Sequence, residues 1–214
     1  MTAIIAAVAA AYLVGSIPTA VWVGNLFYKV DIRKKGSGNA GATNTIRVLG
    51  LRAGIPVLLF DILKGWFAVY IGNFFPLSPD TFPDNLDLKI ILAIAAVAGH
   101  IFPLFAGFRG GKGIATLFGV GIALYPLSAA IVLGVFVLVL LSSRYVSLAS
   151  ITASVSFPLV EMLVLGNTHY PSLMILSILV AIFVPITHRK NIQRLIRNEE
   201  NKFRFGKTKS GNKK

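Results

Sequence analysis

The sequence predicts an all-α polytopic membrane protein with seven transmembrane helices. Of its 214 residues, 55% are hydrophobic and 14% are charged, whereas soluble chains carry about a quarter charged residues. Apolar runs close to the roughly 20 residues that a helix needs to cross hydrocarbon recur along the whole chain. Segments rich in Lys and Arg alternate with these runs, as expected for the loops of a polytopic membrane protein.

The apolar runs supply the expected spans in chain order. Residues 114–142 form an apolar run too long for one ordinary span, and Pro126 divides it into two short helices because proline lacks the N–H that a helix interior needs. Residues 76–87, with three Pro and three Asp, form an exposed loop. The seven spans are expected at about 3–27, 53–75, 88–105, the two halves of 114–142, 146–165 and 171–187.

The basic residues predict the orientation. Nineteen of the 21 Lys and Arg residues lie in 28–52, 104–113, 142–145 and after 187. By the positive-inside rule these segments are cytoplasmic and the N-terminus lies outside, which requires the break at Pro126 if the basic tail is to end in the cytoplasm. The net charge of +13 is thereby explained by topology, and no nucleic-acid partner is expected. One integral membrane domain is expected over 1–214, with a flexible tail at about 203–214.

The stretch GSGNAGATNTIR (36–47) is the first candidate anion site. Its glycines allow backbone N–H groups to approach an anion closely. A helix that begins near Gly41 would direct its free N–H groups and positive dipole end to the same place. Asn44 and Arg47, three residues apart, would share a face of that helix. The alternative is a glycine-rich turn between two hydrophobic segments.

The stretch GFRGGKG (107–113) is a second phosphate-style loop that opens a helix. A nucleotide P-loop is excluded, because Ala106 stands where its first glycine is required and Gly113 follows the lysine. Lys112 would act as a point charge for a phosphate group, with Gly110 and Gly111 beside it. A tight cytoplasmic turn explains this stretch alone equally well.

The segment that starts at His188 is expected to form a short interfacial helix. His188 either acts as a base or only binds an oxyanion. The face turned to the protein is expected to carry His188, Asn191, Ile192, Leu195 and Glu199. The face turned to anionic headgroups is expected to carry Lys190, Gln193, Arg194 and Arg197.

Charged residues within the spans are few. Asp61 and Lys64 are three residues apart and can pair on one helix face, whereas Glu161 is expected to snorkel from the outer end of its span. Ser150 lies at the inner end of the sixth span, where its hydroxyl can face the cytoplasmic site. With no cysteine and no close histidine pair, we expect no metal site, no cofactor and no covalent acyl-enzyme.

Three segments together resemble one family, the bacterial acyl-phosphate-dependent glycerol-3-phosphate acyltransferases, which are integral membrane enzymes of phospholipid synthesis. GSGNAGATNTIR (36–47), GFRGGKGIATLFG (107–119) and HRKNIQRL (188–195) look like the family's three cytoplasmic motifs, in order and at matching spacing. FDILKG (60–65), GHIFP (99–103) and RYVSLASI (144–151) extend the resemblance to nearly the whole chain.

The resemblance implies acyl transfer from acyl-phosphate to the 1-hydroxyl of sn-glycerol 3-phosphate, with lysophosphatidic acid and inorganic phosphate as products. It also implies a bacterial inner-membrane location with a cytoplasmic active site, membrane lipid as surroundings and no direct use of acyl-CoA. The oligomeric state stays open, and a monomer is plausible. The implied catalytic residues are Ser37, Arg47, Lys112, His188 and Asn191. The implied substrate-binding residues are Gly38, Asn39, Gly41, Thr43, Asn44, Gly110, Gly111, Gly113 and Ser150.

Two functions of other classes compete with the enzyme. A transporter for a phosphorylated metabolite would also carry basic loops, but the basic motifs lie on one side of the membrane and the two halves of the chain show no evident repeat. A non-catalytic adaptor that binds anionic lipid would explain the basic tail but neither glycine motif. Release of inorganic phosphate on mixing both substrates would distinguish the enzyme from either.

Overall fold

The computed structural model describes residues 2–75, 85–166 and 170–203, and every regular element within them is helical. The predicted loop at 76–87 and the predicted flexible tail lie largely outside these residues. The helices are α1 (Thr2–Gly15), α2 (Thr19–Tyr28), α3 (Ala42–Leu49), α4 (Leu51–Tyr70), α5 (Leu86–Ile101), α6 (Ile114–Leu124), α7 (Pro126–Ser143), α8 (Val146–Leu159), α9 (Pro171–Thr187) and α10 (Arg189–Ile196).

Within the described residues, four helices are long and apolar enough to cross a membrane, or up to six if each bent pair counts as one span. The predicted break at Pro126 is confirmed, since α6 ends at Leu124 and α7 begins at Pro126. The first expected span is broken as well: α1 and α2 meet at a 41° bend. Pro18, which cannot donate a backbone hydrogen bond, precedes α2.

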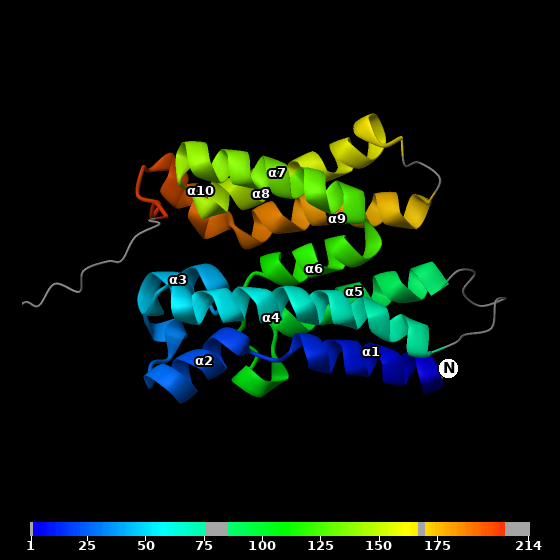
Figure 1. Cartoon of the computed structure of the whole chain (residues 1–214), viewed down its shortest axis with the longest axis horizontal. Coiled ribbons are helices and arrows are strands. Elements are labelled where there is room, and N and C mark those ends of the chain that lie inside the picture. The colour runs from blue at the N-terminus through cyan, green and yellow to red at the C-terminus, as the bar shows by residue number, and fades with distance from the viewer. Residues whose placement is uncertain (1, 76–84, 167–169, 204–214) are drawn as a thin grey trace, which may run out of the picture.

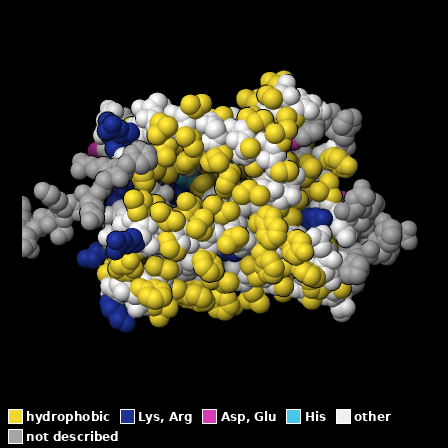
Figure 2. All heavy atoms as spheres, in the orientation of Figure 1, with side chains coloured by type: hydrophobic (Ala, Val, Ile, Leu, Met, Phe, Trp, Pro, Cys, Tyr) yellow, Lys and Arg dark blue, Asp and Glu magenta, His cyan; other side chains and the backbone are white. Residues whose placement is uncertain are grey.

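The helices form two groups with α6 between them (Figure 1). α1, α2, α4 and α5 lie in one group, and α7, α8 and α9 lie in the other, while α3 and α10 lie at the same end of the molecule. Most Lys and Arg side chains visible in Figure 2 gather at that end, whereas hydrophobic side chains cover the flanks. Parts of the first and third sequence motifs therefore lie at the same end of the molecule.

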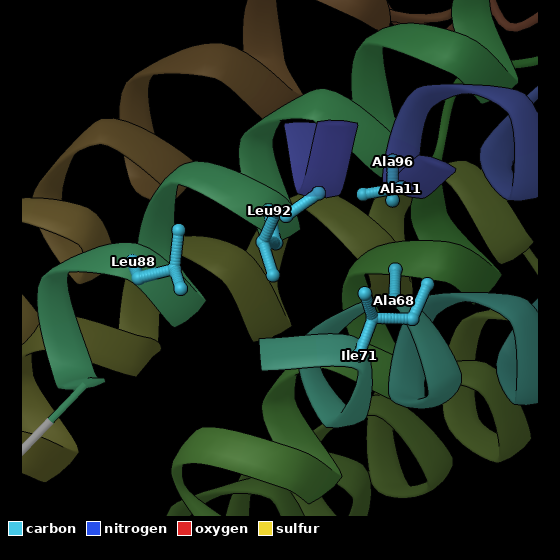
Figure 3. Close-up of a cluster of buried hydrophobic side chains, with 7 residues drawn as sticks. Ala11, Ala68, Ile71, Leu88, Leu92 and Ala96 are labelled. Carbon is cyan, nitrogen blue, oxygen red and sulfur yellow. The ribbon is translucent and has the colours of Figure 1, made fainter. Parts of the chain in front are cut away.

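Small residues let the helices of the first group pack closely. Ala11, Ala68 and Ala96 come together from α1, α4 and α5, with Leu88 and Leu92 beside them (Figure 3). At the contact between α4 and α6, a methyl group at Gly65 or Gly119 would overlap the backbone of the other helix. Close backbone approach through small residues is typical of membrane helix packing, and it places the start of α6 against α4.

A buried polar cluster joins α4 to α2 and to the break between α1 and α2. The predicted pair is confirmed: Lys64 Nζ lies 2.7 Å from Asp61 Oδ1, and both side chains are almost fully buried. The Thr19 hydroxyl donates to Asp61, and Lys64 also donates to the Ile17 carbonyl in the break between α1 and α2. The cluster therefore holds the bend of the first span against α4.

The snorkelling prediction for Glu161 is wrong. Glu161 is 2% exposed and accepts a hydrogen bond from the Ser128 hydroxyl of α7. It lies in a short π-helical segment, Val160–Val164, that continues α8, and this segment keeps the carboxylate between helices instead of directing it outward.

Candidate active site

All three sequence motifs meet at one cavity of about 1030 Å³, termed here the central cavity. It lies between the two groups of helices, and Figure 2 shows a hollow on this face with basic and histidine atoms within it. Of the fourteen residues predicted for the site, thirteen line it. They are Ser37, Gly38, Asn39, Gly41, Thr43, Asn44, Arg47, Gly111, Lys112, Gly113, Ser150, His188 and Asn191.

The first glycine motif is held in place by the side chain of Asn44. Its Nδ2 donates to the carbonyls of Ile32 and Lys35 at 3.0 Å, and its Oδ1 accepts from the Ser37 N–H at 2.8 Å. The predicted helix is present, with Gly41 as its N-cap. However, both N–H groups of the Asn44 amide are used within the loop, which leaves none free to meet a ligand beside Arg47 as predicted.

The segments that precede the first and second motifs also contact each other. Arg33 donates to both carboxylate oxygens of Asp31 and to the carbonyl of Ala106 at 2.8 Å. The Trp22 ring packs near Phe105, with 6.2 Å between ring centroids. The contacts of Arg33 with Ala106 and of Trp22 with Phe105 join residues more than 70 positions apart. No spacing pattern in the sequence indicated them.

Gly110 is the predicted site residue that does not line the central cavity. Its N–H donates to the Ile101 carbonyl at 3.0 Å, and a methyl group there would overlap the His100 carbonyl and the Pro103 ring. Gly110 therefore packs the loop onto the end of α5, a correction to its predicted role. Gly113 does line the cavity, and its φ of +80° at the N-cap of α6 favours glycine.

Lys112 connects the second motif to the third. Its ammonium group donates to Asn191 Oδ1, and Asn191 Nδ2 donates to Glu200 Oε1 at 2.8 Å. Glu200 also accepts from the Ser147 hydroxyl at 3.1 Å and from Arg194 Nε at 2.7 Å. One carboxylate therefore organises the start of α8, α10 and the lysine of the glycine loop.

The polar end of the central cavity carries an excess of positive charge. Burial lowers the pKa of Lys112 to about 8; Glu200 opposes this shift, whereas Arg194 and Arg47 add to it. Burial is also the main reason that the pKa of Arg47 is lowered. Three cations around one carboxylate leave a net positive site, which suits a multiply charged anion.

His188 is neutral and has a defined tautomer. It lies between α9 and α10 and is 3% exposed, and burial together with nearby Lys112 lowers its pKa to about 4. Its Nδ1 lies 2.9 Å from the Val184 carbonyl. Because a carbonyl only accepts, Nδ1 carries the hydrogen and Nε2 keeps its lone pair, so the ring can accept a hydrogen bond through Nε2.

The predicted faces of the third motif are wrong at three residues. Glu199, assigned to the inward face, is exposed, whereas Glu200 lies inside. Lys190 and Arg194, assigned to the headgroup face, line the cavity, and Arg194 pairs with Glu200. The reason is that α10 ends at Ile196 in a Schellman turn, with Asn198 at a φ of +56°. An asparagine just after the last helical turn is a known helix-ending residue, so Asn198 could have indicated from the sequence that α10 ends here. After this turn the chain returns to the site.

Ser150 lines the cavity, but its hydroxyl donates to the Val146 carbonyl of its own helix at 2.9 Å. Beyond Ser150 the cavity becomes apolar and continues between α6 and the second group of helices. This apolar part is lined by Leu117, Phe118, Val132, Phe136, Phe157, Leu176, Val180 and Phe183. The cavity thus joins a cationic end to an apolar end.

Among the described residues, no group of three or more His, Cys, Asp or Glu side chains is placed to hold a metal ion. The side chains that line the polar end include Lys, Arg, a neutral imidazole and amides, with backbone N–H groups beside them. Such groups can bind and orient an anion and a hydroxyl group.

Comparison with known proteins identifies the family. The family model described as glycerol-3-phosphate acyltransferase matches residues 5–198. The glycerol-3-phosphate acyltransferase of Chlorobium limicola is 42% identical, over 97% of this chain and 99% of the relative. That of Fusobacterium nucleatum is 44% identical, over 91% of this chain and 95% of the relative.

A solved structure has the same fold. The crystal structure of PlsY (YgiH), an integral membrane glycerol 3-phosphate acyltransferase, in its glycerol 3-phosphate form is similar with a TM-score of 0.81 and 37% identity. The match covers 94% of this chain and 96% of that chain. A second structure, of the lysophosphatidic acid form, gives a TM-score of 0.79 at 35% identity. The chain therefore belongs to the glycerol-3-phosphate acyltransferase family.

Proposed function

We propose that this protein transfers a fatty acyl group from acyl-phosphate to the 1-hydroxyl of sn-glycerol 3-phosphate. The products are lysophosphatidic acid and inorganic phosphate. The observation that supports this best is the continuity of the central cavity, which leads from three cations around one carboxylate to an apolar end. Both substrates are phosphate anions, and one of them carries a long apolar chain.

The residues of the three motifs divide between the two substrates. Ser37, Gly38, Asn39, Gly41 and Thr43 hold the acyl-phosphate head through hydroxyl, amide and backbone N–H groups. Arg47 and Lys112 neutralise phosphate charge, with Gly111 and Gly113 allowing close approach. His188 and Asn191 hold glycerol 3-phosphate. Ser150 lines the same part of the cavity and contributes least to this contact, because its hydroxyl is bonded to its own helix. Asn44, Gly110 and Glu200 shape the site without touching substrate.

Acyl transfer proceeds by direct attack of the 1-hydroxyl on the acyl carbon. The new ester C–O bond forms, the anhydride C–O bond to phosphate breaks, and the hydroxyl proton ends on the released phosphate. A phosphate group with a pKa of about 6 is a better base than an imidazole with a pKa of about 4. His188 Nε2 therefore orients the hydroxyl, and the leaving phosphate takes the proton. Lys112 and Arg47 stabilise the charge that develops on phosphate.

The chain works as one unit that crosses the bacterial inner membrane seven times. The spans are α1 with α2, then α4, α5, α6, α7, α8 and α9. The N-terminus lies outside, and the motifs face the cytoplasm, where the basic residues gather. At 11 residues, α6 rises only roughly 17 Å, so the loop that precedes it reaches into the membrane. α10 lies at the interface and meets anionic headgroups with Arg197.

The test uses purified protein in detergent or lipid with palmitoyl-phosphate and glycerol 3-phosphate, and follows phosphate release. A parallel reaction replaces the donor with palmitoyl-CoA. We expect release that needs both substrates, with no turnover of the thioester. Turnover of palmitoyl-CoA alone would contradict acyl-phosphate as the donor. The absence of acyl transfer from either donor, with protein shown to be folded, would contradict the enzymatic function.

A further inference from the structure

The apolar part of the central cavity ends at a closed wall. Tyr125, Phe157 and Leu176 line the cavity at this end and are 4%, 9% and 6% exposed. They come from the break between α6 and α7, from α8 and from α9. Three elements from different parts of the chain thus converge on one point opposite the cationic end.

Specific contacts hold the wall in place. The Tyr125 hydroxyl donates to the Leu173 carbonyl of α9 at 2.7 Å. The Tyr125 ring packs edge-on against Phe157, with 4.9 Å between centroids and 81° between ring planes. Because the hydroxyl is already bonded and the rings are locked together, a chain end that reaches this wall cannot displace it cheaply.

The sides of the apolar part are open, unlike its end. Ile94, Leu133 and Leu179 line the cavity, yet they are 50%, 42% and 51% exposed. Their exposed faces lie on the hydrophobic flanks that the surrounding lipid would cover. An alkyl chain can therefore enter from the bilayer, and only the end of the cavity limits how far it extends.

The depth of the cavity matches one lipid leaflet. α6 runs beside it from Gly113, next to Lys112, to Tyr125. Its 11 residues rise roughly 17 Å at about 1.5 Å per residue. Half of the hydrocarbon core is about 15 Å, which is the depth filled by the acyl chain of an ordinary membrane lipid.

We propose that Tyr125, Phe157 and Leu176 act as a stop that sets the length of the acyl chain this enzyme transfers. A chain as long as one leaflet is deep fills the space between Lys112 and the wall. A longer chain must leave through the open side, and a shorter one leaves apolar surface uncovered. This inference rests on the proposed function, because it places the acyl group of the donor in the apolar part.

Two substitutions change the available length in opposite directions. Phe157→Ala removes a wall ring and should lengthen the cavity. Gly121→Val should shorten it, because Gly121 lines the cavity one turn before Tyr125 and a Cβ there would lie 3.6 Å from Ala129 Cβ, an ordinary contact. Matched controls are Leu159→Ala and Gly134→Val, which lie on α8 and α7 outside the lining and face open space.

The experiment measures kcat/KM for lauroyl-, palmitoyl- and arachidoyl-phosphate at fixed glycerol 3-phosphate. We expect wild type to prefer palmitoyl to arachidoyl. Phe157→Ala should raise the arachidoyl-to-palmitoyl ratio about tenfold, and Gly121→Val should lower the palmitoyl-to-lauroyl ratio about tenfold, the smallest effect expected for misfitting methylenes. Both control variants should keep the wild-type ratios. Because the donors differ in solubility to the same extent for every variant, a change of ratio relative to these controls reports on the cavity.

The outcomes separate the length stop from the function on which it rests. Unchanged ratios in both variants, with turnover retained, would overturn the stop and leave the proposed function intact. If wild type turns over no acyl-phosphate, the proposed acyl-phosphate donor is wrong. The same ratios between chain lengths are then measured with acyl-CoA donors. If Phe157→Ala does not fold, Phe157→Leu should give a smaller shift in the same direction, and no shift would count against the stop.

Discussion

Lys64 is a buried lysine of α4, Lys112 is a half-buried lysine of the second glycine motif, and their partners differ. Lys64 pairs directly with Asp61 at 2.7 Å, and both side chains are at most 5% exposed. Lys112 bonds to the neutral amide of Asn191, and the nearest carboxylate, Glu200, is shared with Arg194. One lysine is neutralised by the fold, whereas the other keeps a charge that faces the cavity.

The difference between the two lysines separates a structural charge from a binding charge. A buried ion pair is costly to break, because removal of one partner leaves the other charge buried. A buried cation without its own anion is instead held at a cost in stability, which an anionic ligand relieves. Lys64 should therefore matter for folding and Lys112 for activity.

Replacing Lys112 should give the largest loss of activity. Lys112→Met keeps the length of the side chain but removes the charge that stabilises phosphate, so kcat should fall about a hundredfold to a thousandfold. Phosphate release gives the rate, and the unfolding temperature in detergent gives the stability. We expect that temperature to stay the same or to rise; a large decrease would show that Lys112 has a structural role like that of Lys64.

Replacing Lys64 should mainly affect stability. Lys64→Met leaves Asp61 buried without its partner, which should cost about 3–5 kcal/mol. The unfolding temperature should then decrease by roughly 10 °C for a chain of this size. The control is the double variant Asp61→Asn, Lys64→Met, which removes both charges and should recover most of the loss; no recovery would argue against the pair as the cause.

The pH profile sharpens the comparison. With a lowered pKa of about 8, Lys112 is charged below that pH and loses its proton as the pH rises through it. kcat/KM, which reports the free enzyme, should therefore fall about tenfold per pH unit above about 8. In Lys112→Arg the decline should move beyond the measured range, because arginine stays charged. A decline that persists unchanged in this variant would belong to another group.

The smallest effect is expected at Ser150. Its hydroxyl is bonded to its own helix at the Val146 carbonyl, so Ser150→Ala removes a weak local bond and should change kcat/KM by about twofold or less. Ser37→Ala, which removes a hydroxyl of the first glycine motif, serves as the comparison and should lose more. A loss above tenfold at Ser150 would show that its hydroxyl turns toward substrate during the reaction.

Sequence patterns by themselves determined the helical class, the break at Pro126, the pair of Asp61 with Lys64 and the motifs that meet at the central cavity. These features follow from local chemistry and spacing: apolar length, the missing N–H of proline, and residues three apart on one helix face. Contacts between distant segments follow no such period, and they were missed.

Tertiary structure alone decided the roles within the site. It showed that Asn44 braces its own loop, that Gly110 packs on α5, and that Glu200 holds Asn191 and Arg194. It also closed the apolar part of the cavity with residues of three elements. A polar group in a buried site is free for a ligand only if no neighbouring group already forms a hydrogen bond with it. Those neighbours are brought together by the folded chain. For this reason the sequence predicted which residues line the cavity better than it predicted the contacts they make.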